Sequence, residues 1–477
     1  MLWLPILTSG RGIREKGTRS LTFLSGSPRP WGVVAAALVL RLGSAGVAQA
    51  QTPSPTPSPP PRLFQDELDL QANANVVQGS GARAFGMGGA FLARADDATA
   101  ASWNPAGLSY LRAPELSFVW INSDLGDERR NAAGQLVEND QGSGGAPDFL
   151  AFTYPFEVGS VSGAAQLSFQ RVLSFDSDRT ITETDRVRLV NSSGGFDVIA
   201  LGSGWQLSRG LRLGVTLNRW FDGYDRTVQV PGPREIPTRQ NSRFRFSGWN
   251  VHLGVIWSPW QSLNLGAVFK TGFTADVTLE RSRVDFFEAE DGTQTQTTNA
   301  YARDDLRLDF PGAAGVGASW RPRSNLTLSL DYTRTGWSTG KIYNFFTLQR
   351  TEVGQEPPVP RFPKDFFPVL PYPTLDDTDQ QDSSQLRAGI EYVVIWKRLK
   401  WPVRAGYFGD DQYFRAVGGA PRFRGLSVGT GLIVGPALLD VAYVRETGAY
   451  TSIDGLRHDV VSNRIYASLI YRHRRKP

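Results

Sequence analysis

The sequence predicts an all-β protein, an antiparallel transmembrane β-barrel of about 14 strands with an N-terminal hatch that plugs the lumen. Three observations carry this prediction. They are strict period-two alternation from about residue 114 onward, connections that alternate between short and long, and a composition rich in glycine and aromatic residues. We expect the hatch over residues 63–112, the barrel over residues 113–472 and a basic tail over residues 473–477.

Residues 1–50 are typical of a secretory signal peptide. A basic leader precedes the apolar stretch from Trp31 to Leu40, and Ala48-Gln49-Ala50 offers a cleavage site of small residues. The apolar run is too short to cross a bilayer as a helix, which disfavours a membrane anchor. We therefore predict cleavage after Ala50.

The net charge of +5 belongs to this leader. The first 50 residues hold six basic residues and one acidic residue. Removing them from the 51 basic and 46 acidic residues of the chain leaves 45 of each. A neutral remainder gives no support to nucleic-acid binding, so we expect no nucleic-acid partner.

Residues 51–62 contain the tract TPSPTPSPPPR, which is rich in proline, serine and threonine. Such a tract adopts extended polyproline II and does not join a hydrophobic core. We interpret it as a spacer between the signal peptide and the hatch.

The hatch is predicted from the glycine-rich stretch Gly81 to Leu108, GARAFGMGGAFLARADDATAASWNPAGL. Glycine and alanine suit backbone that is held in a confined space, and Pro105 fixes a turn by pushing Asn104 into an extended conformation. On composition alone an ordinary glycine-rich loop fits equally well.

From about residue 114 the apolar residues recur at every second position. This alternation is clearest in four segments: Val161–Phe169, Leu211–Leu217, Trp249–Trp257 and Leu326–Tyr332. One apolar face and one polar or glycine face over about ten residues is typical of a transmembrane β-barrel strand.

A soluble β-sandwich would also alternate, with its apolar face toward a core. The ends of the apolar faces decide between the two folds, because many carry an aromatic residue, such as Trp257, Trp320, Tyr392 and Tyr443. Amphipathic rings favour the headgroup level of a bilayer, so their placement favours the membrane barrel.

The connections also alternate in length. Short ones fall at residues 155–160, 207–210, 258–262, 321–325, 396–401 and 435–436. Long polar ones fall at 123–147, 171–195, 222–242, 281–303, 335–383, 411–422 and 446–462. Short periplasmic turns and long outer loops are typical of outer-membrane barrels, and the resulting strand number is even.

Composition excludes several kinds of chemistry. The chain has no cysteine, which excludes disulfides and thiolate metal sites, and only three histidines. We expect no metal, no cofactor and no catalytic residue. His252 faces the lumen in the predicted register, so a serine hydrolase is an alternative that we consider weak.

The chain resembles the FadL/TodX family of outer-membrane transporters for long-chain fatty acids and other hydrophobic compounds. The resemblance rests on GARAFGMGG, ADDATA and WNPAGL in the hatch, which cover under a tenth of the chain. QLRAGIEY, from Gln385 to Tyr392, adds weaker support.

The resemblance implies passive uptake of hydrophobic compounds by loop capture, hatch rearrangement and lateral exit through a kinked strand in the wall. It implies hatch or gating roles for Gly81, Gly86, Gly88, Gly89, Asp96, Asp97, Asn104, Pro105 and Ala106, with Asn104-Pro105-Ala106 packed against the wall. Gly163, beside the small residues Ala164 and Ala165, is our candidate for the lateral opening. A glycine that merely smooths the wall is the alternative.

The long connection 335–383 combines aromatic residues with prolines. We interpret it as a capture site for an apolar ligand, and a cluster that caps the barrel mouth is the alternative. Its candidate ligand-capture residues are Tyr343, Phe345, Phe346, Phe362, Phe366, Phe367 and Tyr372.

Two other functions fit a barrel of this kind: a partner in a protein secretion system and a general diffusion porin. We expect location in a Gram-negative type of outer membrane after export through the signal peptide. The expected partners are hydrophobic small molecules such as fatty acids, outer-membrane lipid and lipopolysaccharide, and the barrel-assembly machinery during insertion.

The sequence departs from the family pattern at both ends. The proline tract precedes the hatch, so the mature N-terminus cannot reach a ligand pocket without threading the spacer through it. The last predicted strand ends at Tyr471, which is an aromatic residue of the type that the insertion machinery recognises. A basic tail follows it.

Overall fold

The computed structural model describes the chain from Gly79 to His473 with several gaps. The described residues are 79–183, 187–231, 238–288, 294–339, 342–345, 351–352, 374–375, 381–397, 399–414, 416–452 and 455–473. The signal peptide, the spacer and residues 63–78 of the hatch lie outside them, so their boundaries stay predictions.

Strands make up almost all of the described chain. They are β1 Glu115–Arg130, β2 Leu136–Val158, β3 Val161–Ser174, β4 Ser177–Glu183, β5 Val187–Gln206, β6 Leu211–Val230, β7 Thr238–Trp260, β8 Leu263–Lys270, β9 Phe273–Glu288, β10 Gln294–Phe310, β11 Ala313–Arg323, β12 Leu326–Thr335, β13 Ile342–Phe345, β14 Thr351–Glu352, β15 Thr374–Leu375, β16 Ser383–Trp396, β17 Leu399–Asp411, β18 Arg422–Val434, β19 Ala437–Thr451 and β20 Arg457–Arg472.

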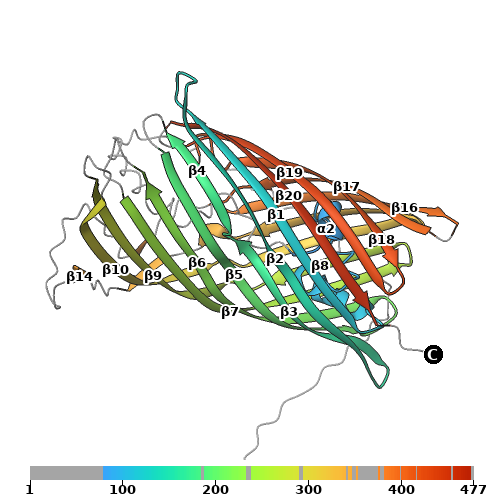
Figure 1. Ribbon diagram of the computed structural model, residues 1–477. Helices are drawn as coiled ribbons and strands as arrows, with labels where there is room; N and C mark the ends of the chain where they lie inside the picture. Colours follow the sequence, from blue (N-terminus) through green and yellow to red (C-terminus); the bar gives the residue numbers. More distant parts are fainter. Residues whose placement is uncertain are drawn as a thin grey trace, which may run out of the picture. The chain divides into compact units, whose positions relative to one another are not determined.

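Fourteen of these described strands close a ring of antiparallel neighbours. The ring runs β1-β2-β3-β5-β6-β7-β8-β11-β12-β16-β17-β18-β19-β20 and returns to β1. Figure 1 shows the closure, with β1 in cyan beside β20 in red. The predicted strand number and antiparallel closure are confirmed, and closure leaves the ring without an exposed edge strand.

The outer face of the ring is apolar and its inner face is polar. On β3, Leu167 is 54% exposed, whereas Gln166 and Ser168 on either side are buried. A sandwich would bury the leucine and expose the polar residues, so this pattern rejects the sandwich. An exposed apolar band around a closed barrel needs lipid, which makes the fold a transmembrane barrel.

The long connections are shorter than the sequence predicts. Strand β6 continues to Val230 and β7 begins at Thr238, so most of the predicted loop 222–242 is strand. Likewise β4 occupies part of the predicted loop 171–195, and β9 and β10 occupy much of 281–303. The loop assignment was wrong there because polar strands beyond the bilayer keep their ladder but lose the apolar alternation that marks a strand.

Within the described residues, three short helices precede the barrel: α2 Ala82–Gly86, α3 Ala100–Trp103 and the 3₁₀ helix η2 Pro105–Tyr110. No helix within the described residues has the length and apolar character needed to cross a membrane. We call residues 79–112, which contain these helices, the lumenal segment. It begins at Gly79, the first described residue, and ends shortly before β1.

Candidate functional site: the lumenal segment and the pocket beside it

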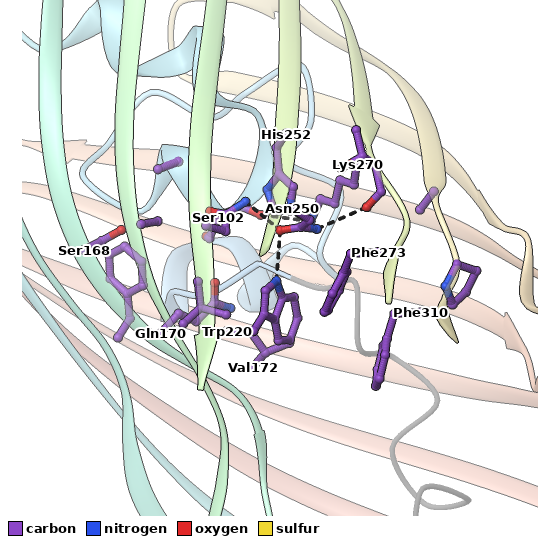
Figure 2. Close-up of a pocket in the computed structure, with 18 of the residues that line it drawn as sticks. Ser102, Ser168, Gln170, Val172, Trp220, Asn250, His252, Lys270, Phe273 and Phe310 are labelled. Atoms are coloured by element: carbon purple, nitrogen blue, oxygen red, sulfur yellow. Dashed lines mark hydrogen bonds between the residues drawn. The ribbon is translucent and has the colours of Figure 1, made fainter. Parts of the chain in front are cut away.

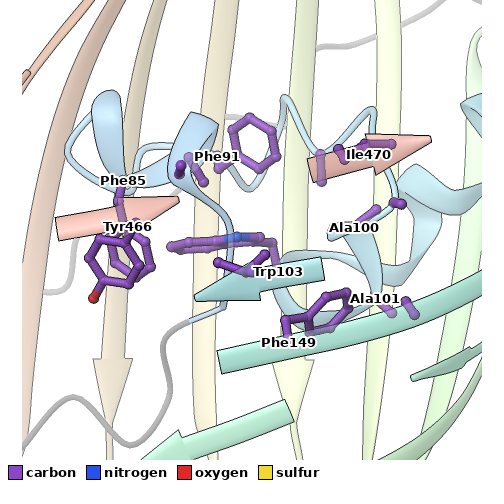
Figure 3. Packing of buried hydrophobic residues seen from close by; sticks show 14 of the residues in the cluster. Phe85, Phe91, Ala100, Ala101, Trp103, Phe149, Tyr466 and Ile470 are labelled. Atoms are coloured by element: carbon purple, nitrogen blue, oxygen red, sulfur yellow. The ribbon is translucent and has the colours of Figure 1, made fainter. Parts of the chain in front are cut away.

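The lumenal segment lies inside the barrel, because it contacts walls on opposite sides of the ring. Helix α2 packs on β17, β18, β19 and β20, whereas η2 packs on β3, β5, β6 and β7. Its apolar residues form one buried cluster with the wall (Figure 3). In that cluster the rings of Phe85 and Tyr466 stack at 4.0 Å, and Trp103 lies edge-on to Phe85. Such packing fixes the segment across the lumen.

Glycines of the wall meet the segment wherever the two backbones approach. A Cβ added to Gly204 on β5 would lie 2.7 Å from the Pro105 carbonyl oxygen, and one at Gly266 on β8 would lie 2.6 Å from the Leu92 carbonyl oxygen. Six wall glycines leave no room for a side chain in this way: Gly204, Gly214, Gly254, Gly266, Gly389 and Gly406. We call these six residues the glycine belt.

The glycine belt follows the strand register. Gly214 pairs with both Gly204 and Gly254, and Gly389 pairs with Gly406. Our sequence reasoning did not single these residues out. The signal was present for Gly214 and Gly254, which lie on the polar or glycine face of the predicted segments Leu211–Leu217 and Trp249–Trp257.

The predicted glycines of the segment lie at the same contacts. Gly81, Gly88 and Gly89 have positive φ values of 110°, 67° and 75°, which disfavour any other residue. A Cβ on Gly88 would lie 3.0 Å from the backbone nitrogen of Tyr407, and one on Gly86 would lie 3.1 Å from the Cα of Gly429. Glycine is therefore needed both for backbone conformation and for space.

Asn104 joins the segment to two wall strands. Its Oδ1 accepts a hydrogen bond from the backbone N–H of Ala106 at 3.1 Å, which caps η2. Its Nδ2 donates to the carbonyl oxygens of Val255 on β7 at 3.1 Å and Ala267 on β8 at 3.3 Å. Pro105 occupies the first position of η2, where it needs no N–H partner, and Ala106 is fully buried.

Asp97 shapes the segment itself, because its Oδ1 accepts from both the N–H and the hydroxyl of Thr99, at 2.9 and 2.7 Å. Asp96 pairs with Arg83 at 2.6 Å, and Arg83 also reaches Glu391 on β16. Buried charges of this kind are tolerated only when paired, so the network ties the segment to one side of the wall.

Glu391 is the wall residue at the centre of this network. Besides Arg83, it accepts from Arg94 of the segment at 2.7 Å and from Arg404 of β17 at 2.8 Å. Arg404 in turn donates to Asp440 on β19 at 2.6 Å. The segment is thus held by ion pairs on the β16–β19 side and by close backbone contact on the β5–β8 side.

The start of the segment contacts β2. Ser80 donates its hydroxyl to the buried carboxylate of Asp148. The backbone of Ser80 is fixed from both sides, since its N–H donates to Ser102 Oγ at 3.0 Å and its carbonyl accepts from Trp103 Nε1 at 2.7 Å. Ser80 therefore connects α3 to β2.

A pocket lies between α3 and the inner wall (Figure 2). It encloses about 690 Å³, counted to its open mouth. One end is polar, with Asn218, Asn250, His252 and Lys270, and the other end is aromatic. His252 therefore lines the lumen, as the predicted register required.

The polar end is organised by hydrogen bonds. Asn250 Oδ1 accepts from Asn218 Nδ2 at 3.0 Å and from Trp220 Nε1 at 2.9 Å. Lys270 Nζ donates to the Ser102 carbonyl at 3.2 Å, so a cation of the wall contacts the lumenal segment at the edge of the pocket. Within the described residues, no group of His, Asp or Glu side chains forms a metal site.

The aromatic end continues away from the segment as a row of rings. Phe273 stacks on Trp220 and on Phe310, each at 5.2 Å between centroids. Trp337 lies between Phe310 and Tyr413, and burial raises the pKa of the Tyr413 phenol above its usual value, which keeps the group neutral. Beyond the segment, the inner side of the barrel thus holds a cluster of packed aromatic side chains.

The wall ladder is interrupted between β2 and β3. Pairing with β3 covers residues 149–158 of β2, and pairing with β4 covers residues 138–143. Residues 144–148 of β2 and residues 171–177 across from them form no ladder with each other, and we call this stretch the seam. Trp120 on β1, the partner of Pro147, is an exposed aromatic, so the seam lies at the edge of the apolar band.

A cavity of about 1110 Å³, counted to its open mouth, lies behind the seam and is lined by Gly79, Asp148 and the turn from β3 to β4. Gly163, our candidate for the lateral opening, lies elsewhere. It pairs with Phe156 on β2 and Trp205 on β5 in unbroken register, and its role in an opening stays a prediction. The irregularity of β3 falls further along, between Arg171 and Leu173.

The predicted capture loop lies largely outside the described residues. This applies to Phe346, Phe362, Phe366, Phe367 and Tyr372. The backbones of Tyr343 and Phe345 belong to β13, which pairs with β10. The capture role stays a prediction.

The family model described as BamG matches residues 82–354, which is more than half of the chain. The chain therefore belongs to the BamG family. No curated protein sequence matches it.

Solved structures match the fold over most of their length. A Pseudomonas aeruginosa FadL homologue is 13% identical, with a TM-score of 0.54 over 83% of this chain and 98% of that chain. The P. putida toluene transporter TodX is 13% identical, with a TM-score of 0.54 over 84% and 100%. The Ralstonia pickettii toluene transporter TbuX is 14% identical, with a TM-score of 0.50 over 83% and 99%. The expected FadL/TodX type of fold is thereby confirmed.

Proposed function

We propose that this member of the BamG family is an outer-membrane transporter for the passive uptake of hydrophobic or amphipathic compounds. The observation that carries the proposal is the pocket between the lumenal segment and the aromatic row, which joins an apolar end to a polar end. A lumen lined in this way binds a ligand by burial of apolar area, with a few polar groups to orient it.

The pocket chemistry favours a ligand with an aromatic or aliphatic body and a hydrogen-bonding or anionic head. The body would pack against Trp220, Phe273 and Phe310, and the head would face Asn250 and Lys270. Fatty acids fit this description, and so do substituted aromatic compounds. The TodX and TbuX structures are of toluene transporters, which is in line with an aromatic body.

The lumenal segment is suited to a gate. It crosses the lumen, and its position beside the pocket lets a ligand act on it directly. Ser102 lines the pocket and is bonded to Lys270 and to Ser80, and Ser80 is bonded to Asp148 behind the seam. A ligand that displaces Ser102 would therefore disturb the contact at the seam.

The seam is our proposed exit. Over five residues β2 has no ladder with β3 or β4, so these strands separate more easily there than paired strands would, because fewer bonds oppose the movement. Because the seam lies at the edge of the apolar band, an apolar compound would pass through it into lipid without contact with water. This route replaces an opening at Gly163 with one further along the same strand.

A second candidate function is a partner role in barrel assembly or protein secretion. The match to the BamG model favours it, since that family carries the name of a component associated with barrel assembly. A general diffusion porin is less well supported, because polar solutes would have to pass a lumen crossed by the packed segment.

The transporter proposal is tested by ligand retention. The delipidated protein is incubated with fatty acids, alkanes and aromatic compounds, and native mass spectrometry measures what stays bound. Ala200 lines the pocket, whereas its neighbour Ile199 faces outward and is exposed. We expect Ala200→Trp to fill the pocket and abolish retention, and Ile199→Trp to leave it unchanged.

No retention by the wild type, or equal loss in both variants, would count against the transporter. Retention of a large protein partner during purification, with no bound apolar compound, would favour the partner role instead.

A further inference from the structure

The end of the barrel with the short turns carries exposed cations that have no acidic neighbour. They lie in or beside three turns: Arg209 between β5 and β6, Arg321 and Arg323 between β11 and β12, and Lys397 and Lys400 between β16 and β17. We call these five residues the basic rim. None of them forms an ion pair with a described residue, and Glu157 is the one exposed carboxylate that the structure describes at this end.

The opposite end of the barrel is different. Several exposed arginines there pair with a carboxylate on a neighbouring strand or on the same strand, whereas Arg239 and Arg424 form no ion pair with a described residue. Examples are Arg130 with Glu128, Arg243 with Asp225, and Arg422 with Asp411. Many charges at that end are therefore paired, whereas no cation of the basic rim is paired with a described residue, and the rim leaves a positive surface that is open to an external anion.

The basic rim occupies one sector of the barrel. The three turns belong to the consecutive ring strands from β5 to β17. The turn from β2 to β3 carries Glu157 instead, and the turn from β18 to β19 is Gly435-Pro436, which has no charge. Two further cations at this end are engaged locally, since Arg112 bonds Ser162 and Gln206, and Arg472 pairs with Glu115.

Exposed tryptophans place the rim at headgroup depth. Trp320 immediately precedes Arg321, Trp396 immediately precedes Lys397, and Trp401 immediately follows Lys400, and all three are about half exposed or more. Two more, Trp257 and Trp260, lie at the end of β7, just before the turn to β8 in the same sector. Tryptophan rings settle at the membrane interface, so the adjacent cations lie at the level of the lipid phosphates.

We propose that the basic rim is a binding surface for anionic phospholipid headgroups in the leaflet at the short-turn end of the barrel. The charge of the rim is unopposed, its depth matches the phosphate layer, and arginine and lysine donate readily to phosphate oxygens. The rim would hold one sector of the barrel against an anionic lipid patch. This inference does not depend on the proposed transport function.

The test compares lipid selectivity in nanodiscs made from phosphatidylethanolamine with and without phosphatidylglycerol. Native mass spectrometry measures the lipids that stay bound to the full chain after release from the discs. The rim variant carries Arg209→Gln, Arg321→Gln, Arg323→Gln, Lys397→Gln and Lys400→Gln. The matched control removes five exposed cations at the other end, with Arg130→Gln, Arg243→Gln, Arg303→Gln, Arg422→Gln and Arg457→Gln.

We expect the wild type and the control to retain phosphatidylglycerol in preference to phosphatidylethanolamine, and the rim variant to lose the preference. Each cation near an anionic surface is worth about a fivefold change in binding, so even single replacements should be measurable. The preference should also weaken as salt concentration rises.

Three results would overturn the inference. They are no lipid preference in the wild type, an equal loss in the control variant, and an unchanged lipid preference in the rim variant together with loss of an acidic soluble partner. The last result would assign the rim to a protein partner instead of a lipid. Heat-modified mobility on gels checks that each variant is a folded barrel.

Discussion

At the residue scale, Gly214 illustrates how the wall and the lumenal segment fit. It lies on β6, pairs with glycines on both sides, and faces the carbonyl of Pro105 so closely that a Cβ has no space. A methyl group there must push the segment or bend the strand, because protein interiors are close-packed.

We therefore expect Gly214→Ala to lower the free energy of unfolding by about 1–3 kcal/mol, the usual cost of overpacking. The change should also raise ion leakage by loosening the segment. Gly126→Ala is the control, since a Cβ on Gly126 has no neighbour within 4 Å. Equal midpoints of unfolding in denaturant for both variants would contradict the proposed fit.

Some of the residues at these contacts could be predicted from the sequence. It singled out Gly86, Gly88, Gly89 and Asn104, which lie at contacts between the segment and the wall, and Gly81, which lies against Thr99 within the segment. It could not identify Glu391 as the centre of the ion-pair network. A single glutamate in an alternating strand has the pattern of any lumen-facing charge, and its two partners in the segment lie about 300 residues away in the sequence.

At the element scale, the strands were predicted well where one face is apolar and poorly beyond the bilayer. The apolar alternation disappears where both faces meet water, yet the ladder continues in β4, β9 and β10. The seam was also out of reach from sequence. A break in a ladder depends on the register of two strands and on the turn from β3 to β4, which no local pattern encodes.

The seam and the segment offer a direct test of movement at this scale. The chain contains no cysteine, so a pair introduced as Ser80→Cys and Asp148→Cys is the only thiol pair present. These two side chains are in contact, which makes a disulfide feasible. We expect oxidation to block uptake of a labelled fatty acid into proteoliposomes, and reductant to restore it.

The two single-cysteine variants serve as controls, because they lose the hydrogen bond but cannot form the cross-link. Transport that is unaffected by oxidation in the double variant would show that the start of the segment need not leave β2. In that case the lumenal segment does not act as a gate at β2, although the pocket could still bind ligand.

At the scale of the whole molecule, closure explains why the segment is present. A ring of fourteen strands encloses a lumen wide enough for water, and the helices α2 and η2 of the segment alone contact eight strands of the ring. The sequence predicted the closed barrel and the position of the hatch before it, because alternation, turn lengths and glycine content all depend on local residues. The ligand depends on residues brought together from several strands.

The most direct test of the central claim is the ion conductance of the barrel in planar bilayers, with and without residues 79–112. We expect the conductance of the full chain to stay near the baseline and the deletion variant to show a large, steady conductance. Heat-modified mobility on gels confirms that the deletion still forms a barrel. An open pore in the full chain, or no change on deletion in a folded barrel, would contradict a lumen sealed by its N-terminal segment.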